Sequence, residues 1–265
     1  MLFVGDLKGL ITRQAREKRQ YFEEGVILDL LLQVTVALNH VHSRKILHRD
    51  IKSRNIFLAH NNQVRLGDFG ICRVLESLDD EADTAIGTPA FASPEVCRLE
   101  PYNYKADIWS LGCVLYELMC LREPFPGISC RDIQKRVIRG QYPHPPRFYS
   151  PELRNLLSSM LSLSPDARPS CADILKSNIV SERIRANINK GTLTADLFSA
   201  VFVDWDACPP VLPNKPPSAT FRAEYRKVVS LVFLLQRALV SGVQRKAGWL
   251  EIHPLSCYVV LFALC

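Results

Sequence analysis

Features typical of several protein classes are missing from this 265-residue sequence. Its nine cysteines form no C-x-x-C pair and show no zinc-finger spacing. Their odd number, with Cys113 and Cys120 in an apolar stretch, favours reduced, buried thiols over a disulfide framework. No run of about 18 uninterrupted apolar residues occurs, so we expect no membrane-spanning helix. Residues 1–6 become polar too early for the core of a signal peptide. We therefore expect a cytoplasmic or nuclear protein.

An excess of one charge is also nearly absent. Lysine and arginine number 33 and aspartate and glutamate 27, which gives a net charge of +6. This excess is compatible with phosphate-bearing ligands but too diffuse to indicate binding to nucleic acid. Hydrophobic residues make up 48% and charged residues 23%, the balance of an ordinary globular chain. We expect one sizeable domain with an appendage and no nucleic-acid partner, and the composition indicates no oligomeric state.

Hydrophobic periodicity predicts a mainly helical chain with one small hairpin. In residues 24–43 apolar side chains recur at steps of three and four, so we expect a helix that is buried nearly all round. The short segments 55–58 and 63–66 flank the turn pair Asn61-Asn62, which favours a β-hairpin. Prolines separate the further helices, which are predicted at 105–121 and near 130–139, 151–161 and 170–177.

The last part of the chain differs in composition. We assign residues 1–185 to one domain and residues 186–265 to a proline-containing linker and an unassigned tail, because Cys208-Pro-Pro and the prolines between 213 and 217 interrupt regular structure. One helical candidate spans residues 224–240. Its apolar stretch is too short for a membrane span.

One segment carries most of the chemical information: His48-Arg-Asp-Ile-Lys-Ser-Arg-Asn55, followed by Asp68-Phe-Gly70. Phosphoryl transfer from a nucleotide needs a carboxylate that orients the attacking hydroxyl and oxygen ligands for Mg²⁺. It also needs a positive charge on the transferring phosphoryl oxygens. The first motif supplies Asp50, Lys52 and Asn55 from one loop, and the second supplies the metal carboxylate Asp68.

These two motifs resemble the catalytic and magnesium loops of protein kinases. The segments ILHRDIKSRNIFL, LGDFGICRVL and YNYKADIWSLGCVLYELMCLREPF are similar to the NIMA-related (Nek) serine/threonine kinases in particular. The resemblance covers about residues 5–185 and implies a protein-kinase-like fold, namely a mainly α-helical C-terminal (large) lobe with a small β-hairpin. Four more motifs follow in the kinase order: Gly87-Thr-Pro89, Ser93-Pro-Glu95, Asp107-Ile-Trp109-Ser-Leu-Gly112 and Asp166-Ala-Arg168-Pro169.

The resemblance implies a role for each residue of the two loops. Asp50 is the base or hydroxyl-orienting group, Lys52 contacts the γ-phosphate of ATP, and Asn55 and Asp68 bind Mg²⁺. ATP and Mg²⁺ are thus the expected cofactors, and protein substrates are the expected partners. Lys52 and Thr88 both match the pattern of serine/threonine kinases.

Further residues have structural or regulatory roles by the same resemblance. Asp107 accepts backbone N–H bonds from the catalytic loop and holds it rigid. Glu95 and Arg168 form a buried pair that anchors the activation segment. Thr84 aligns with the activation-loop phosphosite, and a phosphate there could pair with Arg49. The alternative for Thr84 is an ordinary loop hydroxyl.

The start of the chain departs from the kinase pattern. No G-x-G-x-x-G precedes His48, and Lys8, the first lysine, lies in a helical pattern instead of an apolar strand. Because Gly5-Asp6-Leu7 resembles the start of the first large-lobe helix, we expect the small N-terminal β lobe to be absent. Two functions stay open. One is a serine/threonine protein kinase present as a truncated catalytic domain, which transfers the ATP γ-phosphoryl group to protein hydroxyls. The other is a catalytically inert kinase-lobe fragment that acts as a protein-binding module.

Overall fold

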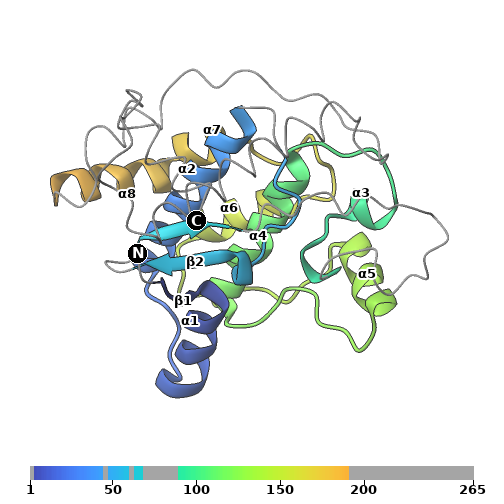
Figure 1. The fold of residues 1–265 in the computed structure, drawn as a ribbon, viewed down its shortest axis with the longest axis horizontal. Helices are drawn as coiled ribbons and strands as arrows, with labels where there is room; N and C mark the ends of the chain where they lie inside the picture. Colours follow the sequence, from blue (N-terminus) through green and yellow to red (C-terminus); the bar gives the residue numbers. More distant parts are fainter. Residues whose placement is uncertain (1–2, 44–46, 60–62, 68–88, 191–265) are drawn as a thin grey trace, which may run out of the picture.

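A computed structural model describes residues 3–43, 47–59, 63–67 and 89–190 of the chain. These residues form helices packed around a buried core, with one small sheet at the side of the core (Figure 1). The elements in chain order are β1 (Phe3–Asp6), α1 (Leu7–Arg13), α2 (Glu24–Ser43), β2 (Ile56–Ala59), β3 (Val64–Leu66), α3 (Pro94–Cys97), α4 (Lys105–Cys120), α5 (Cys130–Arg139), α6 (Pro151–Met160), α7 (Cys171–Lys176) and α8 (Asn178–Asn189).

The sheet is antiparallel with the strand order β1-β2-β3. Strands β2 and β3 form the predicted hairpin, in which Phe57 lies opposite Arg65. Strand β1 was not predicted, and it pairs with β2 so that Gly5 lies opposite Leu58. The helix α1 follows β1 directly, and Asp6 caps it by accepting a hydrogen bond from the backbone N–H of Gly9. Residues 53–55, which directly precede β2, therefore lie beside α1.

Helix α4 forms the centre of the core. Every residue from Ala106 to Cys120 except Ser110 is buried. Helices α2 and α6 pack against α4, while α3 and α5 lie together at one end of the molecule and α8 lies at the other (Figure 1). A helix that is apolar on all sides belongs inside a domain, since no face of it is suited to water. The prediction of a second apolar helix at 105–121 is confirmed.

Helix α2 has the predicted bounds, and 12 of its 20 residues are buried. By length and composition it is the helix in the described part of the chain that could cross a membrane, but 67% of its most apolar window is buried inside the fold. This burial is what a core helix of a globular domain shows. Cys113 and Cys120 are buried free thiols, as predicted. Cys171 is also a buried free thiol, whereas the free thiol of Cys130 is exposed.

The later helices begin at polar capping residues. Ser129, Ser150 and Ser170 each accept a backbone N–H at the start of α5, α6 and α7, and Ser170 forms a capping box with Asp173. The predicted helices near 130–139, 151–161 and 170–177 are therefore confirmed to within one residue at each end. Helix α8 was not predicted, and its bounds cross the predicted domain boundary at residue 185. The helical candidate 224–240 lies outside the described residues.

Candidate active site

The loop between α2 and β2 brings three of the predicted catalytic residues together. The side-chain ammonium group of Lys52 lies 2.9 Å from Oδ1 and 2.7 Å from Oδ2 of Asp50. The amide nitrogen of Asn55 donates to Oδ2 of Asp50 at 2.8 Å and to the backbone carbonyl of Asp50 at 2.9 Å. The Asp50 side chain is 31% exposed and that of Lys52 is 20% exposed, so this cluster is open to a ligand from solvent.

Local structure explains this convergence. Ser53–Asn55 form a single 3₁₀ turn directly before β2, which turns the chain back and places the Asn55 side chain beneath Asp50. Ile51, between Asp50 and Lys52, is 1% exposed and fixes the loop to the core. Arg49 has φ of +67°, in the left-handed region that residues other than glycine rarely adopt. Such a conformation persists only where the surroundings hold it.

Asp107, in the first turn of α4, supplies that hold. Its Oδ2 accepts the backbone N–H of His48 at 3.0 Å and its Oδ1 accepts that of Arg49 at 2.9 Å. The side chain of His42, near the end of α2, contacts the same Oδ2 through Nε2 at 2.8 Å. Asp107 is 2% exposed, so its charge is met almost entirely by these three groups. The loop is therefore anchored to α4 and α2.

Burial acts in opposite directions on the two titratable groups of this anchor. It would raise the pKa of Asp107, but the hydrogen bonds that Asp107 accepts from the His42 side chain and the His48 backbone outweigh it and hold that pKa below its usual value. Burial lowers the pKa of His48, and the nearby carboxylates of Asp107 and Asp50 only partly oppose this. The anchor is thus built for an ionised Asp107 beside a neutral His48.

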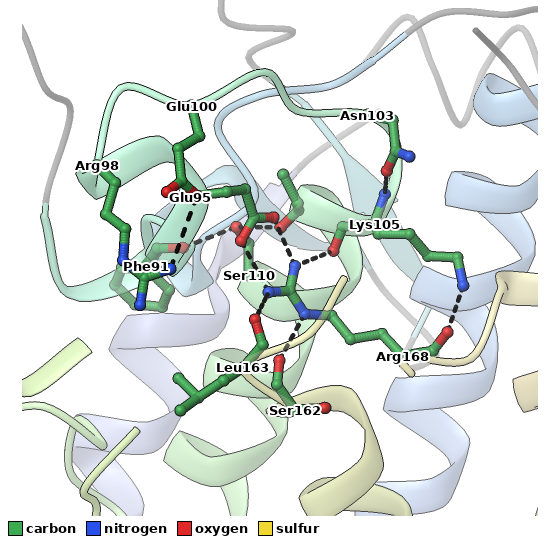
Figure 2. A network of polar contacts seen from close by, with 11 residues as sticks. Phe91, Glu95, Arg98, Glu100, Asn103, Lys105, Ser110, Ser162, Leu163 and Arg168 are labelled. Atoms are coloured by element: carbon green, nitrogen blue, oxygen red, sulfur yellow. Dashed lines mark hydrogen bonds and ion pairs between the residues drawn. The ribbon is translucent and has the colours of Figure 1, made fainter. Parts of the chain in front are cut away.

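A second charged cluster joins Glu95 of α3 to Arg168, which lies just before α7. Arg168 donates two bonds to the carboxylate of Glu95, at 2.6 Å to Oε1 and 2.8 Å to Oε2 (Figure 2). Its other three N–H groups reach the backbone carbonyls of Ser162, Lys105 and Leu163 at 2.8, 3.0 and 3.3 Å. All five guanidinium donors are therefore used. The guanidinium also lies over the ring of Trp109, at 5.1 Å from its centroid.

Sequence reasoning missed an ionic cluster beside the catalytic loop. Lys8 of α1 contacts Oε1 of Glu117 in α4 at 2.5 Å and Glu123 at 3.1 Å. Glu117 is fully buried and burial raises its pKa, although Lys8 and the hydroxyl of Ser53 act against this. Glu117 and Lys8 lie 109 positions apart. The one available signal was an acidic residue inside an otherwise apolar helical stretch.

Three predicted residues, Asp68, Thr84 and Thr88, lie outside the described residues. Within the described ranges no group of three or more His, Cys, Asp or Glu side chains could hold a metal ion. The predicted magnesium site combines Asn55 with Asp68 and so is not of that type. An asparagine binds a hard cation through its carbonyl oxygen, and the hydrogen bonds from Asn55 to Asp50 use its nitrogen. The carbonyl oxygen of Asn55 is therefore the atom that would bind Mg²⁺.

The protein kinase domain model matches residues 3–180, which include every described residue of these clusters. The chain belongs to the protein kinase domain family. It is similar to serine/threonine-protein kinase Nek1 of Mus musculus, with 42% identity over 210 residues that cover 79% of this chain and 17% of Nek1. It is also similar to Nek5 of Homo sapiens (47% over 173 residues, 65% of this chain and 24% of Nek5) and Nek2 of Homo sapiens (40% over 185 residues, 68% and 41%).

The resemblance to the NIMA-related kinases is thereby confirmed, as is the mainly helical kinase-like fold with a small sheet. This kinase-domain chain spans between 17% and 41% of the length of the three relatives named above. Kinase domains in general use ATP and Mg²⁺. The domain boundary at residue 185 and the roles of the individual site residues stay predictions.

Proposed function

We propose that this chain carries the catalytic loop of a serine/threonine protein kinase, which transfers the γ-phosphoryl group of ATP to a serine or threonine hydroxyl of a protein. The observation that carries the proposal is the partly exposed Asp50–Lys52 pair with the buried Asn55 bonded to Asp50, in a chain of the kinase family. The similar Nek proteins are all named serine/threonine-protein kinases. Lys52 also matches the sequence pattern of serine/threonine kinases.

Each residue of the cluster has a distinct task. Asp50 orients the attacking hydroxyl and takes up its proton as the oxygen bonds to the γ-phosphorus and the bond to the bridging oxygen of ADP breaks. Two donors of the Lys52 ammonium group are used on Asp50, so its third can reach a γ-phosphoryl oxygen. Asn55 fixes the Asp50 carboxylate. Asn55 and Asp68 would hold Mg²⁺, which when bound neutralises charge on the phosphates.

The anchors support these tasks by keeping the loop rigid. Asp107 holds the backbone of His48 and Arg49, and catalysis of this kind depends almost wholly on positioning. Glu95 and Arg168 fix the segment that follows residue 88 to the large lobe. We propose that Thr84 is the phosphosite of this segment and that Arg49 receives its phosphate.

The rival function is a protein-binding module without turnover. Thermal unfolding of the full chain with increasing Mg-ATP separates the two functions. A transition temperature that rises with nucleotide concentration supports a usable site. No rise at millimolar Mg-ATP, together with no transfer of labelled phosphate to a protein substrate, would leave the binding module as the function.

The matched variant is Asp50→Asn, which keeps the size of the side chain and removes the proton acceptor. We expect it to abolish labelled-phosphate transfer while the Mg-ATP shift persists, because Asp50 acts on the hydroxyl and not on the nucleotide. Transfer at the rate of the unchanged chain would overturn the role of Asp50.

A further inference from the structure

A chain of buried polar contacts connects α7 to the catalytic loop. The thiol of Cys171, the first residue of α7, lies 3.7 Å from Nδ1 of His42. The other ring nitrogen of His42, Nε2, lies 2.8 Å from Oδ2 of Asp107. Asp107 in turn accepts the backbone N–H groups of His48 and Arg49. Cys171 and His42 are separated by 129 positions in sequence.

The chemistry of these groups determines which atom donates and which accepts in each contact. A carboxylate only accepts hydrogen bonds, so Nε2 of His42 must carry a hydrogen and donate it to Asp107. In a neutral imidazole the other nitrogen then has only a lone pair and needs a donor. Cys171 is 2% exposed, and burial raises the pKa of its thiol well above the usual value, so the group facing Nδ1 is S–H.

We propose that Cys171 is a positioning residue: its thiol donates to Nδ1 of His42 and thereby holds the ring as the neutral Nε2–H tautomer that supports Asp107 beneath the catalytic loop. This role deepens the proposed function and rests on it. The contacts that carry it are independent of any phosphoryl transfer.

Among the described residues, the groups that face His42 leave this task to Cys171. Asp107 faces the ring from α4 and Cys171 faces it from α7. The edge contact with the ring of Tyr104 has a centroid distance of 5.6 Å, and His48 approaches from the loop. His42 is 6% exposed, which makes water a poor donor for Nδ1. Without the thiol, no donor among the described residues is placed to bond Nδ1.

The test is nitrogen NMR of the full chain labelled with ¹⁵N-histidine at neutral pH, with the signals of His42 assigned from a His42→Gln variant. We expect a protonated Nε2 and an Nδ1 that accepts a hydrogen bond. Cys171→Ala and the volume-matched Cys171→Val should both shift the Nδ1 signal. Cys171→Ser, which restores a donor, should return it toward the original position.

Cys113→Ala is the control, because it truncates another buried thiol, in the middle of α4, and should leave the His42 signals unchanged. A proton on Nδ1 in the unchanged chain would overturn the proposal. So would an Nδ1 signal that stays in place in both Cys171→Ala and Cys171→Val. If Cys171→Ala does not fold, Cys171→Val and the unchanged chain decide the question.

Amide exchange tests the link to the loop. The N–H groups of His48 and Arg49 should exchange about fivefold faster in Cys171→Ala, the order expected when one supporting hydrogen bond is lost. Cys171→Ser should exchange like the unchanged chain. Unaltered exchange in Cys171→Ala would overturn the positioning role. A chain with the His42 signature and no phosphoryl transfer would instead overturn only the proposed function.

Discussion

Two carboxylate–cation pairs in this fold differ in what surrounds them. The Asp50–Lys52 pair is 31% and 20% exposed, and each partner has donors or acceptors within reach of solvent. The Glu95–Arg168 pair is 4% and 0% exposed, and all five guanidinium donors are used inside the protein. A carboxylate–cation pair therefore forms an open site in one place and a closed anchor in the other.

The difference teaches how charge is divided between function and stability in this fold. An exposed pair is screened by water and contributes little to folding, which leaves its groups available to a ligand. A buried pair has lost its hydration, so each partner depends on the other and neither is available. The predictions below test this division.

Removal of one partner of the buried anchor should have the largest effect. Arg168→Met keeps most of the apolar side-chain volume but leaves the Glu95 carboxylate buried without its cation. We expect the free energy of unfolding to fall by about 3–5 kcal/mol. Urea unfolding of the full chain, followed by far-UV circular dichroism, measures it. The control is Arg136→Gln, which breaks an exposed pair with Asp132 (N–O distance 3.7 Å) and should change stability by less than about 0.5 kcal/mol.

The Lys8–Glu117 pair lies between these extremes and should give an intermediate effect. Glu117 is fully buried but Lys8 is 24% exposed, so we expect Lys8→Met to cost about 1–3 kcal/mol in the same unfolding experiment. Adding Glu117→Met should recover most of the loss, because the uncompensated carboxylate is then gone. Glu123→Gln is the control, since Glu123 is 36% exposed and lies 3.1 Å from Lys8. A loss that persists in the double variant would mean that Lys8 acts through packing instead.

The anchor beneath the catalytic loop should show a pH dependence near neutrality. The pKa of His48 is lowered in the folded chain by burial, below the usual value of about 6.5. The unfolded chain therefore binds more protons as pH falls through that value, so stability rises with pH between the folded pKa and about 6.5. Asp107 has a lowered pKa, so its contribution is present above about pH 4 and is lost only in stronger acid.

Urea unfolding over a series of pH values checks this expectation. His48→Phe should flatten the slope near neutrality without altering the loss of stability in acid. The exposed His144 is the control, and His144→Gln should leave the slope as it is. An unchanged slope in His48→Phe would show that another group titrates there.

What the sequence could predict depended on how far apart the interacting residues lie. Helices 24–43 and 105–121 have strong apolar periodicity, which can be recognised in the sequence without knowing how the helices pack. Asp50, Lys52 and Asn55 lie within six positions, so the motif itself determines most of their geometry. Strand β1 is four residues long and depends on pairing with β2, more than 50 positions away. Nothing local indicates such a strand.

The missed helix and the missed side-chain contacts have the same cause. Helix α8 is largely polar, and it is attached to α2 by Asp29, which accepts from Arg183 and from Asn187. Such contacts depend on the tertiary fold. The same holds for the thiol–imidazole contact of Cys171 and for the Lys8 cluster. The resemblance placed Glu95, Asp107 and Arg168 because it carried tertiary information that periodicity and propensity do not contain.

The smallest effect on stability should come from the proposed catalytic pair. Lys52→Met removes a cation from a carboxylate that is 31% exposed and still accepts from Asn55. Because water can replace the lost contact, we expect the free energy of unfolding to change by less than about 1 kcal/mol. The measurement is the same urea unfolding, with Asn55→Ala in parallel to test the remaining contact. A loss as large as that of Arg168→Met would place Asp50 among the buried anchors and erase the contrast between the two pairs.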